Sequence, residues 1–372
     1  MRIGIIGLPG SGKTTVFNAL TRGKAQAGGY SAGRGANVGV AHVPDQRLGV
    51  LAKMYRPKKV VHGEVVYVDL PGGGAPSTAR DASGPVSELF TGEAVTQLQK
   101  VDALLLVVRA FEDGSVLHIL GSVDWRRDIE KIGFDLLFAD IALIDRRIQR
   151  LNDGMKGLKV ADRDQAHKAV ETLRRVQADL ESGSPLRAMQ LSESEERALQ
   201  NTFLLSGLPL LVAVNIGEQD LARAGEIERD AAALLKGPKT GAAAICAKLE
   251  TELARLPAGE EAEMRAGLGA GESGLSRMIG LSYRVLGLIS FLTVGEDEVR
   301  AWTVPAGSVA TKAAGRVHSD IERGFIRAEV VSYDDLADSG SLAESRKRGH
   351  LRQEGREYLV KDGDVVNFLF SV

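Results

Sequence analysis

The chain has 372 residues, of which 44% are hydrophobic and 26% charged, and its 47 basic and 49 acidic residues give a net charge of −2. This length predicts two or three domains, and the near-neutral charge excludes a protein that binds nucleic acid through a global basic field. The single cysteine excludes an internal disulfide, and the lack of a leader or of a run of about 20 apolar residues predicts a cytoplasmic protein without a membrane segment.

The N-terminus carries a phosphate-binding pattern. Residues 7–14 match G-x-x-x-x-G-K-S/T and lie between an apolar strand at 2–6 and a helical run at 15–20. In this setting, backbone N–H groups and the start of the helix face the phosphates of a nucleotide. We expect Lys13 to reach the β- and γ-phosphates and Thr14 to bind Mg²⁺. The predicted nucleotide contacts are Gly7, Pro9, Gly10, Ser11, Gly12, Lys13, Thr14 and Thr15.

A D-x-x-G sequence, from Asp69 to Gly72, follows a predicted strand at 65–68. A carboxylate at a strand end can hold Mg²⁺ through water, and the glycine N–H can sense the γ-phosphate. We therefore assign Lys13, Thr14, Asp69 and Gly72 to catalysis, and Thr14 and Asp69 to the metal.

Two further apolar runs, at 104–108 and 210–214, are typical of strands buried on both faces and predict a parallel α/β sheet. Between them, apolar residues recur at intervals of 4 and 3, on either side of a helix breaker at 152–157. This rhythm predicts an antiparallel coiled-coil hairpin. Basic residues at its tip form either a solvated helix face or a contact for RNA. The apolar stripe consists of Leu137, Ile141, Ile144, Ile148, Leu151, Ala169, Leu173, Val176 and Leu180.

Base recognition is predicted just after the strand at 210–214, at Asn215, Ile216 and Glu218. Guanine-specific relatives carry N-K-x-D there, with an aspartate that accepts two N–H bonds from guanine. Glutamate at this place would crowd the guanine edge, so we expect weak guanine preference and use of adenine. Cys246 and Ala247 follow another small-residue run and are predicted to back the base.

After residue 290, short β-like runs at 299–304, 325–331 and 365–370 alternate with turns. They predict a compact α+β module at the C-terminus. A basic stretch at 346–350 could contact RNA, but neighbouring glutamates favour an ordinary mixed surface.

These residues resemble the YchF-type, Obg-like ATPases of the translation-factor GTPase class. The resemblance implies an α/β fold with a Ras-like P-loop nucleotide-binding domain at 1–126 and 202–286, an inserted coiled-coil hairpin at 127–201, and a TGS domain at 287–372. It also implies use of ATP with Mg²⁺ and association with the ribosome or ribosomal RNA. Use of GTP stays an alternative. The segments that carry it are 7–14, 37–40, 43–45, 47–48, 57–59, 107–113, 215–218, 295–303, 324–330 and 362–365.

The chain departs from the family at three catalytic places. Gly10 and Ser11 replace asparagine and valine of the family's phosphate loop, which puts activation by a monovalent cation in doubt. Gly33 stands where the first switch carries a threonine, and Gly73 stands where the family has a hydrophobic residue. We therefore expect intact binding of Mg-nucleotide and slow intrinsic hydrolysis.

Three functions remain open on sequence. The first is a slow ATPase switch acting on the ribosome, and the second is a nucleotide-gated binding protein with negligible hydrolysis. The third, a small-molecule P-loop kinase, would not need the N-x-x-E element or the C-terminal module. We further expect a monomer that has neither DNA nor a membrane as partner.

Overall fold

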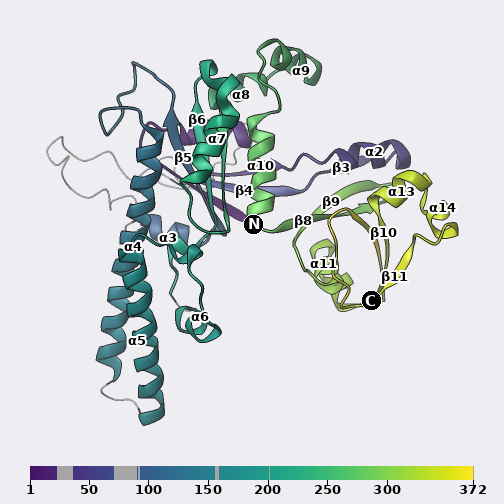
Figure 1. Cartoon of the computed structure of the whole chain (residues 1–372). Coiled ribbons are helices and arrows are strands. Elements are labelled where there is room, and N and C mark those ends of the chain that lie inside the picture. Colours follow the sequence, from purple (N-terminus) through teal and green to yellow (C-terminus); the bar gives the residue numbers. More distant parts are fainter. Residues whose placement is uncertain (23–36, 71–89, 91–92, 156–158, 201, 372) are drawn as a thin grey trace. The chain divides into compact units, whose positions relative to one another are not determined.

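The computed structural model describes residues 1–22, 37–70, 90, 93–155, 159–200 and 202–371 (Figure 1). The chain forms two compact units, one of Met1–Val40 with Val66–Leu281 and the other of Ala41–Val65 with Ser282–Val372. Within these described ranges, no helix is long and apolar enough to cross a membrane.

The first unit is built on a six-stranded sheet in the order β2-β4-β1-β5-β6-β7. Neighbours from β4 to β7 pair in parallel, so their carboxyl ends meet at one edge of the sheet. The register places Ile5 beside Asp69 and Arg109 beside Asn215. The parallel sheet predicted from the apolar runs is confirmed. The strands are β1 (Arg2–Ile6), β2 (Asn37–His42), β4 (Glu64–Asp69), β5 (Ala103–Ala110), β6 (Leu210–Ile216) and β7 (Thr240–Ile245).

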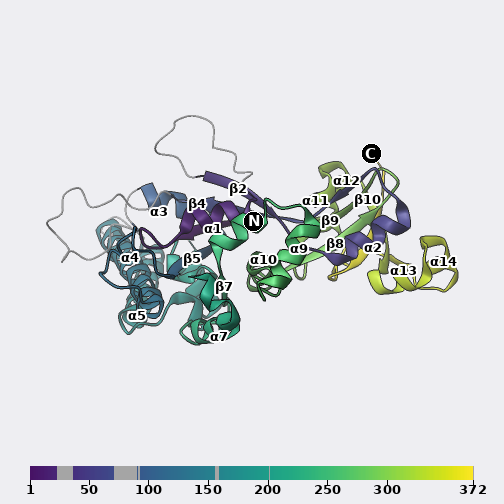
Figure 2. The same ribbon diagram turned by 90° about the horizontal axis from the view of Figure 1, so that it is seen from above.

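Helices flank this sheet, and one of them, α7, packs along the last strand, β7 (Figure 2). Short 3₁₀ turns connect several elements: η3 (Leu186–Ala188), η4 (Leu205–Gly207) and η5 (Glu218–Arg223). The helices are α1 (Lys13–Leu20), α3 (Glu93–Leu98), α4 (Trp125–Gly154), α5 (Val160–Glu181), α6 (Glu193–Leu199), α7 (Ala224–Ala233), α8 (Ala247–Leu253), α9 (Ala258–Gly267) and α10 (Gly274–Val285).

The predicted helical hairpin is present, with α4 and α5 side by side over most of their length (Figure 1). Its buried core contains Leu137, Ile144, Ile148, Leu173, Val176 and Leu180, as the apolar spacing predicts. At the start of the α5 stripe the buried residue is Val170 and not the predicted Ala169, whereas the other three predicted positions of α5 are buried. Helix α4 continues to Gly154, three residues into the predicted breaker.

The root of the hairpin is fastened by the carboxylate of Asp140 in α4. Its two oxygens accept hydrogen bonds from the backbone N–H groups of Leu205 and Ser206, each at 2.7 Å. Asp140 is fully buried, and burial raises its pKa to about 6 although these bonds and the charge of Arg187 lower it. The hairpin is therefore tied to the segment that leads into β6.

The second unit contains a six-stranded sheet in the order β11-β10-β12-β8-β9-β3. All three strands predicted in the C-terminal module are present within β9, β10 and β12, which confirms its α+β character. The strands are β3 (Lys59–Val61), β8 (Leu288–Val294), β9 (Glu298–Pro305), β10 (Phe325–Ser332), β11 (Arg352–Glu354) and β12 (Asp364–Phe370). Its helices are α2 (Gln46–Tyr55), α11 (Ala310–Val317), α12 (Ser319–Arg323), α13 (Tyr333–Ser339) and α14 (Leu342–Lys347).

Residues 41–65 belong to this second unit, whereas the sequence division placed them in the nucleotide-binding domain. The reason is packing: Leu48 and Leu51 of α2 are fully buried in one cluster with Leu292, Val299 and Val331. Strand β3 also extends the sheet by pairing in parallel with β9. The other limits of the predicted three-domain division stay a prediction.

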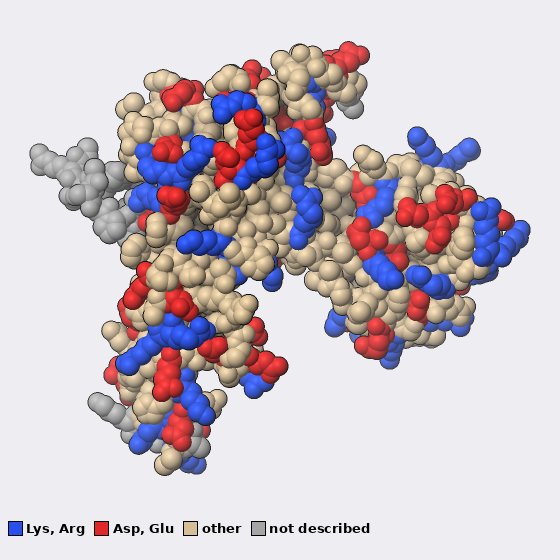
Figure 3. All heavy atoms as spheres, in the orientation of Figure 1, with Lys and Arg blue, Asp and Glu red and all other residues tan. Residues whose placement is uncertain are grey.

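The basic stretch near α14 has acidic partners. Arg346 pairs with Glu329 at 2.7 Å, and Arg348 pairs with Glu344 at 3.1 Å. In the face shown by Figure 3, basic and acidic side chains are interspersed in both units. This pairing favours the mixed-surface interpretation of the stretch over a dedicated RNA contact.

Candidate functional site

The phosphate loop connects β1 to α1 and needs glycine at specific places. A Cβ on Gly7, whose φ is +150°, would lie 2.3 Å from the carbonyl oxygen of Val107. A Cβ on Gly12, whose φ is +88°, would lie 2.3 Å from Nδ2 of Asn215. The first turn of α1 contains no acidic residue of its own, which suits the binding of an anion at the start of this helix.

Lys13 lies at the mouth of this loop. Its ammonium group donates to the carbonyl oxygens of Gly7 at 2.8 Å and Leu8 at 3.1 Å. Burial lowers the pKa of Lys13, and the negative charge of Asp69 acts against that shift. The ammonium group thus lies against the phosphate loop, and its contact with the β- and γ-phosphates stays a prediction.

Thr14 and Asp69 meet beside Lys13. The Thr14 hydroxyl donates to Oδ2 of Asp69 at 3.1 Å, although the two residues lie on different elements, α1 and β4. Oδ1 of Asp69 is buried and has no hydrogen-bond partner among the described residues. Burial raises the pKa of Asp69, while the side chains of Thr14 and Asn37 and the charge of Lys13 lower it.

This pair fits a magnesium ion. A buried carboxylate oxygen without a donor, next to a hydroxyl, is the oxygen ligand set that hard divalent cations accept. Across the described part of the chain, no group of three or more His, Cys, Asp or Glu could hold a metal alone. The ion would therefore need phosphate oxygens and water as its other ligands. Gly72, the remaining predicted catalytic residue, lies outside the described residues.

Asn215 links the predicted base-recognition strand to the phosphate loop. Its Nδ2 donates to the Ser11 carbonyl at 3.1 Å, and its Oδ1 accepts from the N–H of Ala247 at 3.2 Å. The structure thus brings three predicted site residues together. Glu218 is half-exposed on the rim, where its Oε1 lies 3.7 Å from Nζ of Lys248.

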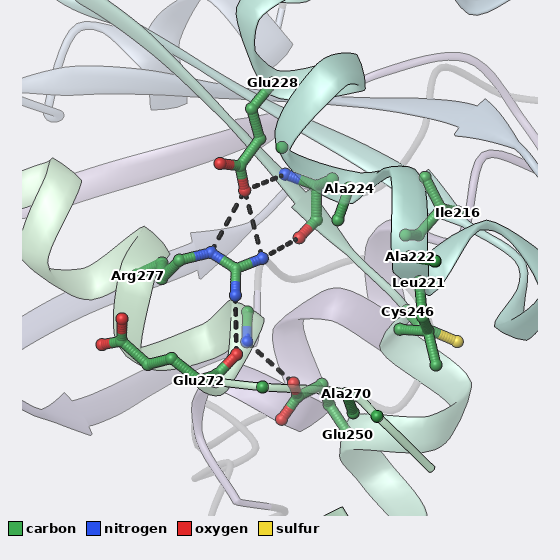
Figure 4. Close-up of a pocket in the computed structure, with 15 residues that line it drawn as sticks. Ile216, Leu221, Ala222, Ala224, Glu228, Cys246, Glu250, Ala270, Glu272 and Arg277 are labelled. Atoms are coloured by element: carbon green, nitrogen blue, oxygen red, sulfur yellow. Dashed lines mark hydrogen bonds and ion pairs between the residues drawn. The ribbon is translucent and has the colours of Figure 1, made fainter.

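Ile216 and Cys246 point away from this junction. Both are buried in the core of the first unit and line a cavity of about 360 Å³ (Figure 4). On the far side of that cavity Glu228 accepts from Ala244 N at 3.0 Å and from Arg277 Nε at 3.2 Å. These two hydrogen bonds fix the end of β7 and the backbone that continues to Cys246 and Ala247.

Arg109 is a site-supporting residue that reasoning from the sequence missed. Although only 2% exposed, its guanidinium donates to the carbonyl oxygens of Phe111 (3.0 Å), Val116 (2.8 Å) and Asp113 (3.2 Å). The loop held in this way reaches the phosphate loop, because a Cβ on Gly10 would lie 3.2 Å from Cγ1 of Val116. A lone charge at the end of the apolar run 104–108 is the signal that could have revealed it.

Comparison with known proteins adds independent evidence. Residues 2–133 match a family model described as "50S ribosome-binding GTPase", and residues 288–371 match a YchF C-terminal model described as "Protein of unknown function (DUF933)". The chain is 38% identical to "Ribosome-binding ATPase YchF" of Bacillus subtilis over 375 residues, covering 99% of each protein. The chain belongs to the YchF family. The YchF protein of Escherichia coli O157:H7 is 35% identical, with 100% of this chain and 99% of that protein covered.

Solved structures agree with this membership. The Schizosaccharomyces pombe YchF GTPase matches with a TM-score of 0.82 at 27% identity, over 99% of this chain and 97% of that chain. A GTP-binding protein of Pyrococcus horikoshii, at 16% identity and a TM-score of 0.56, shares the fold. The YchF resemblance and the P-loop α/β fold expected from the sequence are confirmed.

Proposed function

We propose that this YchF-family protein is a slow, Mg²⁺-dependent ATP-hydrolysing switch that associates with the ribosome. The observation that carries the proposal is the Thr14–Asp69 pair next to Lys13 at the mouth of the phosphate loop, in which Oδ1 of Asp69 has no hydrogen-bond partner within the described part of the chain. P-loop NTPases hold Mg²⁺-nucleotide with these groups.

In this arrangement each residue has a defined task. Lys13 binds the β- and γ-phosphates, and the backbone around Gly12 surrounds them. Thr14 and Asp69 orient the metal, which when bound neutralises charge on the phosphate oxygens. Because Gly33, which lies outside the described residues, carries no hydroxyl at the first switch position, one well-placed contact is missing, at a cost of about 3 kcal/mol or roughly a hundredfold in rate.

The choice of ATP over GTP rests on Glu218. Its longer carboxylate replaces the aspartate that pairs with guanine, and it lies at the rim beside Lys248. A site that pairs poorly with the polar edge of guanine loses affinity for it. GTP therefore remains the weaker ligand in this proposal.

The proposed association with the ribosome rests on the names of the relatives. Proteins at 35–38% identity over nearly the whole chain are named ribosome-binding ATPases. The proposal extends this partner to the present chain, together with a cytoplasmic location and a monomeric state.

Equilibrium binding of ATP, ADP, GTP and GDP with Mg²⁺, followed by turnover on the same sample, tests the function. We expect ATP to bind more tightly than GTP and phosphate release to be slow and faster from ATP. Equal turnover of both nucleotides would refute the adenine preference, and no binding of any purine nucleotide would refute the function.

The second candidate is a nucleotide-gated binding protein with negligible hydrolysis. The two glycines at the switch positions favour it. Single-turnover assays with and without ribosomes separate the two candidates. Bound ATP that survives many hours in both conditions would support the second.

A further inference from the structure

Two exposed side chains of opposite charge stand together at the base end of the nucleotide site. Oε1 of Glu218, at the start of η5, lies 3.7 Å from Nζ of Lys248, in the first turn of α8. Their side chains are 51% and 75% exposed. The backbone next to Lys248 is fixed, because Asn215 accepts from the N–H of Ala247, the residue before Lys248.

The two groups offer different hydrogen-bonding atoms. A carboxylate only accepts, and an ammonium group only donates. The Watson–Crick edge of adenine presents a donor, the N6 amino group, beside an acceptor, N1. The same edge of guanine presents an acceptor, O6, in place of the amino group, and donors at N1 and N2. With the base in the same orientation, O6 would face the carboxylate and N1–H would face the ammonium group, so neither contact would form.

We propose that Lys248 is a specificity-determining residue for adenine: Glu218 accepts from the N6 amino group while the Lys248 ammonium donates to N1. This inference rests on the proposed ATP-binding function and adds to it the residue that distinguishes the two bases. Glutamate disfavours guanine only by its length, whereas the added cation reverses the hydrogen-bonding requirement of the pocket edge.

The charge of Lys248 also acts on a second acidic group, Asp113. The pKa of Asp113 is lowered mainly by hydrogen bonds from Ser115, and the charges of Arg109 and Lys248 also lower it. The carbonyl oxygen of Asp113 accepts from Arg109, so this group belongs to the loop next to the phosphate loop.

The opposing interpretation is an ordinary surface ion pair. Exposed pairs of this kind contribute roughly 0–1 kcal/mol to stability and carry no ligand specificity. The two interpretations predict the same stability for a variant at position 248 and different nucleotide preferences. Affinity ratios, rather than melting temperatures, separate them.

The experiment compares the full-length protein with Lys248→Met and with Lys239→Met. Lys239 is an exposed lysine just before β7, at the opposite end of that strand from Lys248. Dissociation constants for MgATP and MgGTP are measured by calorimetry. Loss of a positive charge weakens both triphosphates alike, so the ratio of the two constants isolates the base.

We expect Lys248→Met to lower the ATP-to-GTP preference about tenfold or more, since one charge-assisted hydrogen bond is lost, and Lys239→Met to leave it within twofold. A preference unchanged within twofold in Lys248→Met overturns the inference and leaves ATP binding standing. No nucleotide binding by the unsubstituted protein overturns the proposed function as well.

A ligand without the acceptor atom supplies the second measurement. 1-Deaza-ATP replaces N1 by C–H and keeps the amino group and the triphosphate. The unsubstituted protein should bind it about tenfold more weakly than ATP, whereas Lys248→Met should bind the two equally. Equal affinity for both ligands in the unsubstituted protein would show that Lys248 does not contact N1.

Discussion

The side-chain amide of Asn215 donates to the carbonyl oxygen of Ser11 at 3.1 Å. This bond joins the end of β6, where base recognition is proposed, to the loop that is proposed to hold the phosphates. The same nitrogen occupies the space where a Cβ on Gly12 would stand, 2.3 Å away. The two ends of the pocket are therefore fixed to each other by one buried side chain.

Gly12→Ala tests this junction. The new methyl group would displace Asn215, and the φ of +88° is strained for alanine, so we expect a loss of about 2 kcal/mol or more in the free energy of unfolding. Nucleotide binding should fall with it. Urea unfolding and ATP calorimetry measure the two effects.

Gly133→Ala is the matched control for that change. Gly133 lies within α4, and a Cβ there would meet nothing within 4 Å. We expect a gain of about 0.5–1 kcal/mol from helix propensity and unchanged nucleotide affinity. Equal behaviour of the two alanine variants would contradict the role given to Gly12.

Asp69→Asn separates metal binding from nucleotide binding. The change removes the charge of the carboxylate and replaces one of its oxygens by an amide group, while the remaining oxygen can still accept from Thr14. We expect the dissociation constant for MgATP to rise at least tenfold and that for ATP in EDTA to stay the same. Stability should hold or improve, because burial disfavours the ionised form of Asp69. A parallel loss of affinity in EDTA would show that Asp69 supports the loop rather than the metal.

Asp140 makes the stability of the protein depend on pH. Its pKa is about 6 in the folded protein against an ordinary 3.8, so between about pH 4 and 6 the folded state binds more protons than the unfolded state. Stability therefore falls as pH rises through this window, by about 3 kcal/mol for this group. Asp140→Asn lacks this titration. The difference in unfolding free energy between the two proteins should favour the native residue more at pH 4 than at pH 7, and a constant difference would contradict the assignment.

Arg109→Met should destabilise the first unit by about 3 kcal/mol. The change leaves three carbonyl oxygens of the loop 111–116 without their donor. Arg126→Met is the control, because Arg126 is about half-exposed and pairs with Asp230 on the surface. The control should lose less than about 1 kcal/mol in urea unfolding. Similar losses in the two variants would argue against a buried anchor at Arg109.

Local patterns in the sequence predicted much of this fold. The run 210–214 predicts β6 because a short, continuous apolar run is typical of a strand buried on both faces. The glycines and Lys13 predict the phosphate loop because their spacing suits a bound phosphate. Leu48 and Leu51 show that such local patterns do not identify partners far away in the sequence. Their spacing identifies an amphipathic helix, but nothing nearby indicates that its partners are Leu292 and Val299, more than 200 residues away.

The candidate site also contains residues that the sequence predicts and one that it does not. Thr14 and Asp69 were predicted together because each belongs to a motif with a known ligand. Arg109 was not, because its role depends on the course of the chain after β5, which brings three carbonyl oxygens around one guanidinium. Buried polar residues outside motifs are visible in a sequence only as charges in apolar runs, and their partners depend on tertiary structure.

The placement of residues 41–65 has a consequence for the gene. No continuous stretch of codons encodes the second unit, because α2 and β3 are translated before most of the nucleotide-binding strands. A fragment that starts at codon 288 would leave Leu292, Val299 and Val331 without the leucines that cover them. Recombination at that boundary would transfer an incomplete module, so the two halves of this protein are expected to be inherited together.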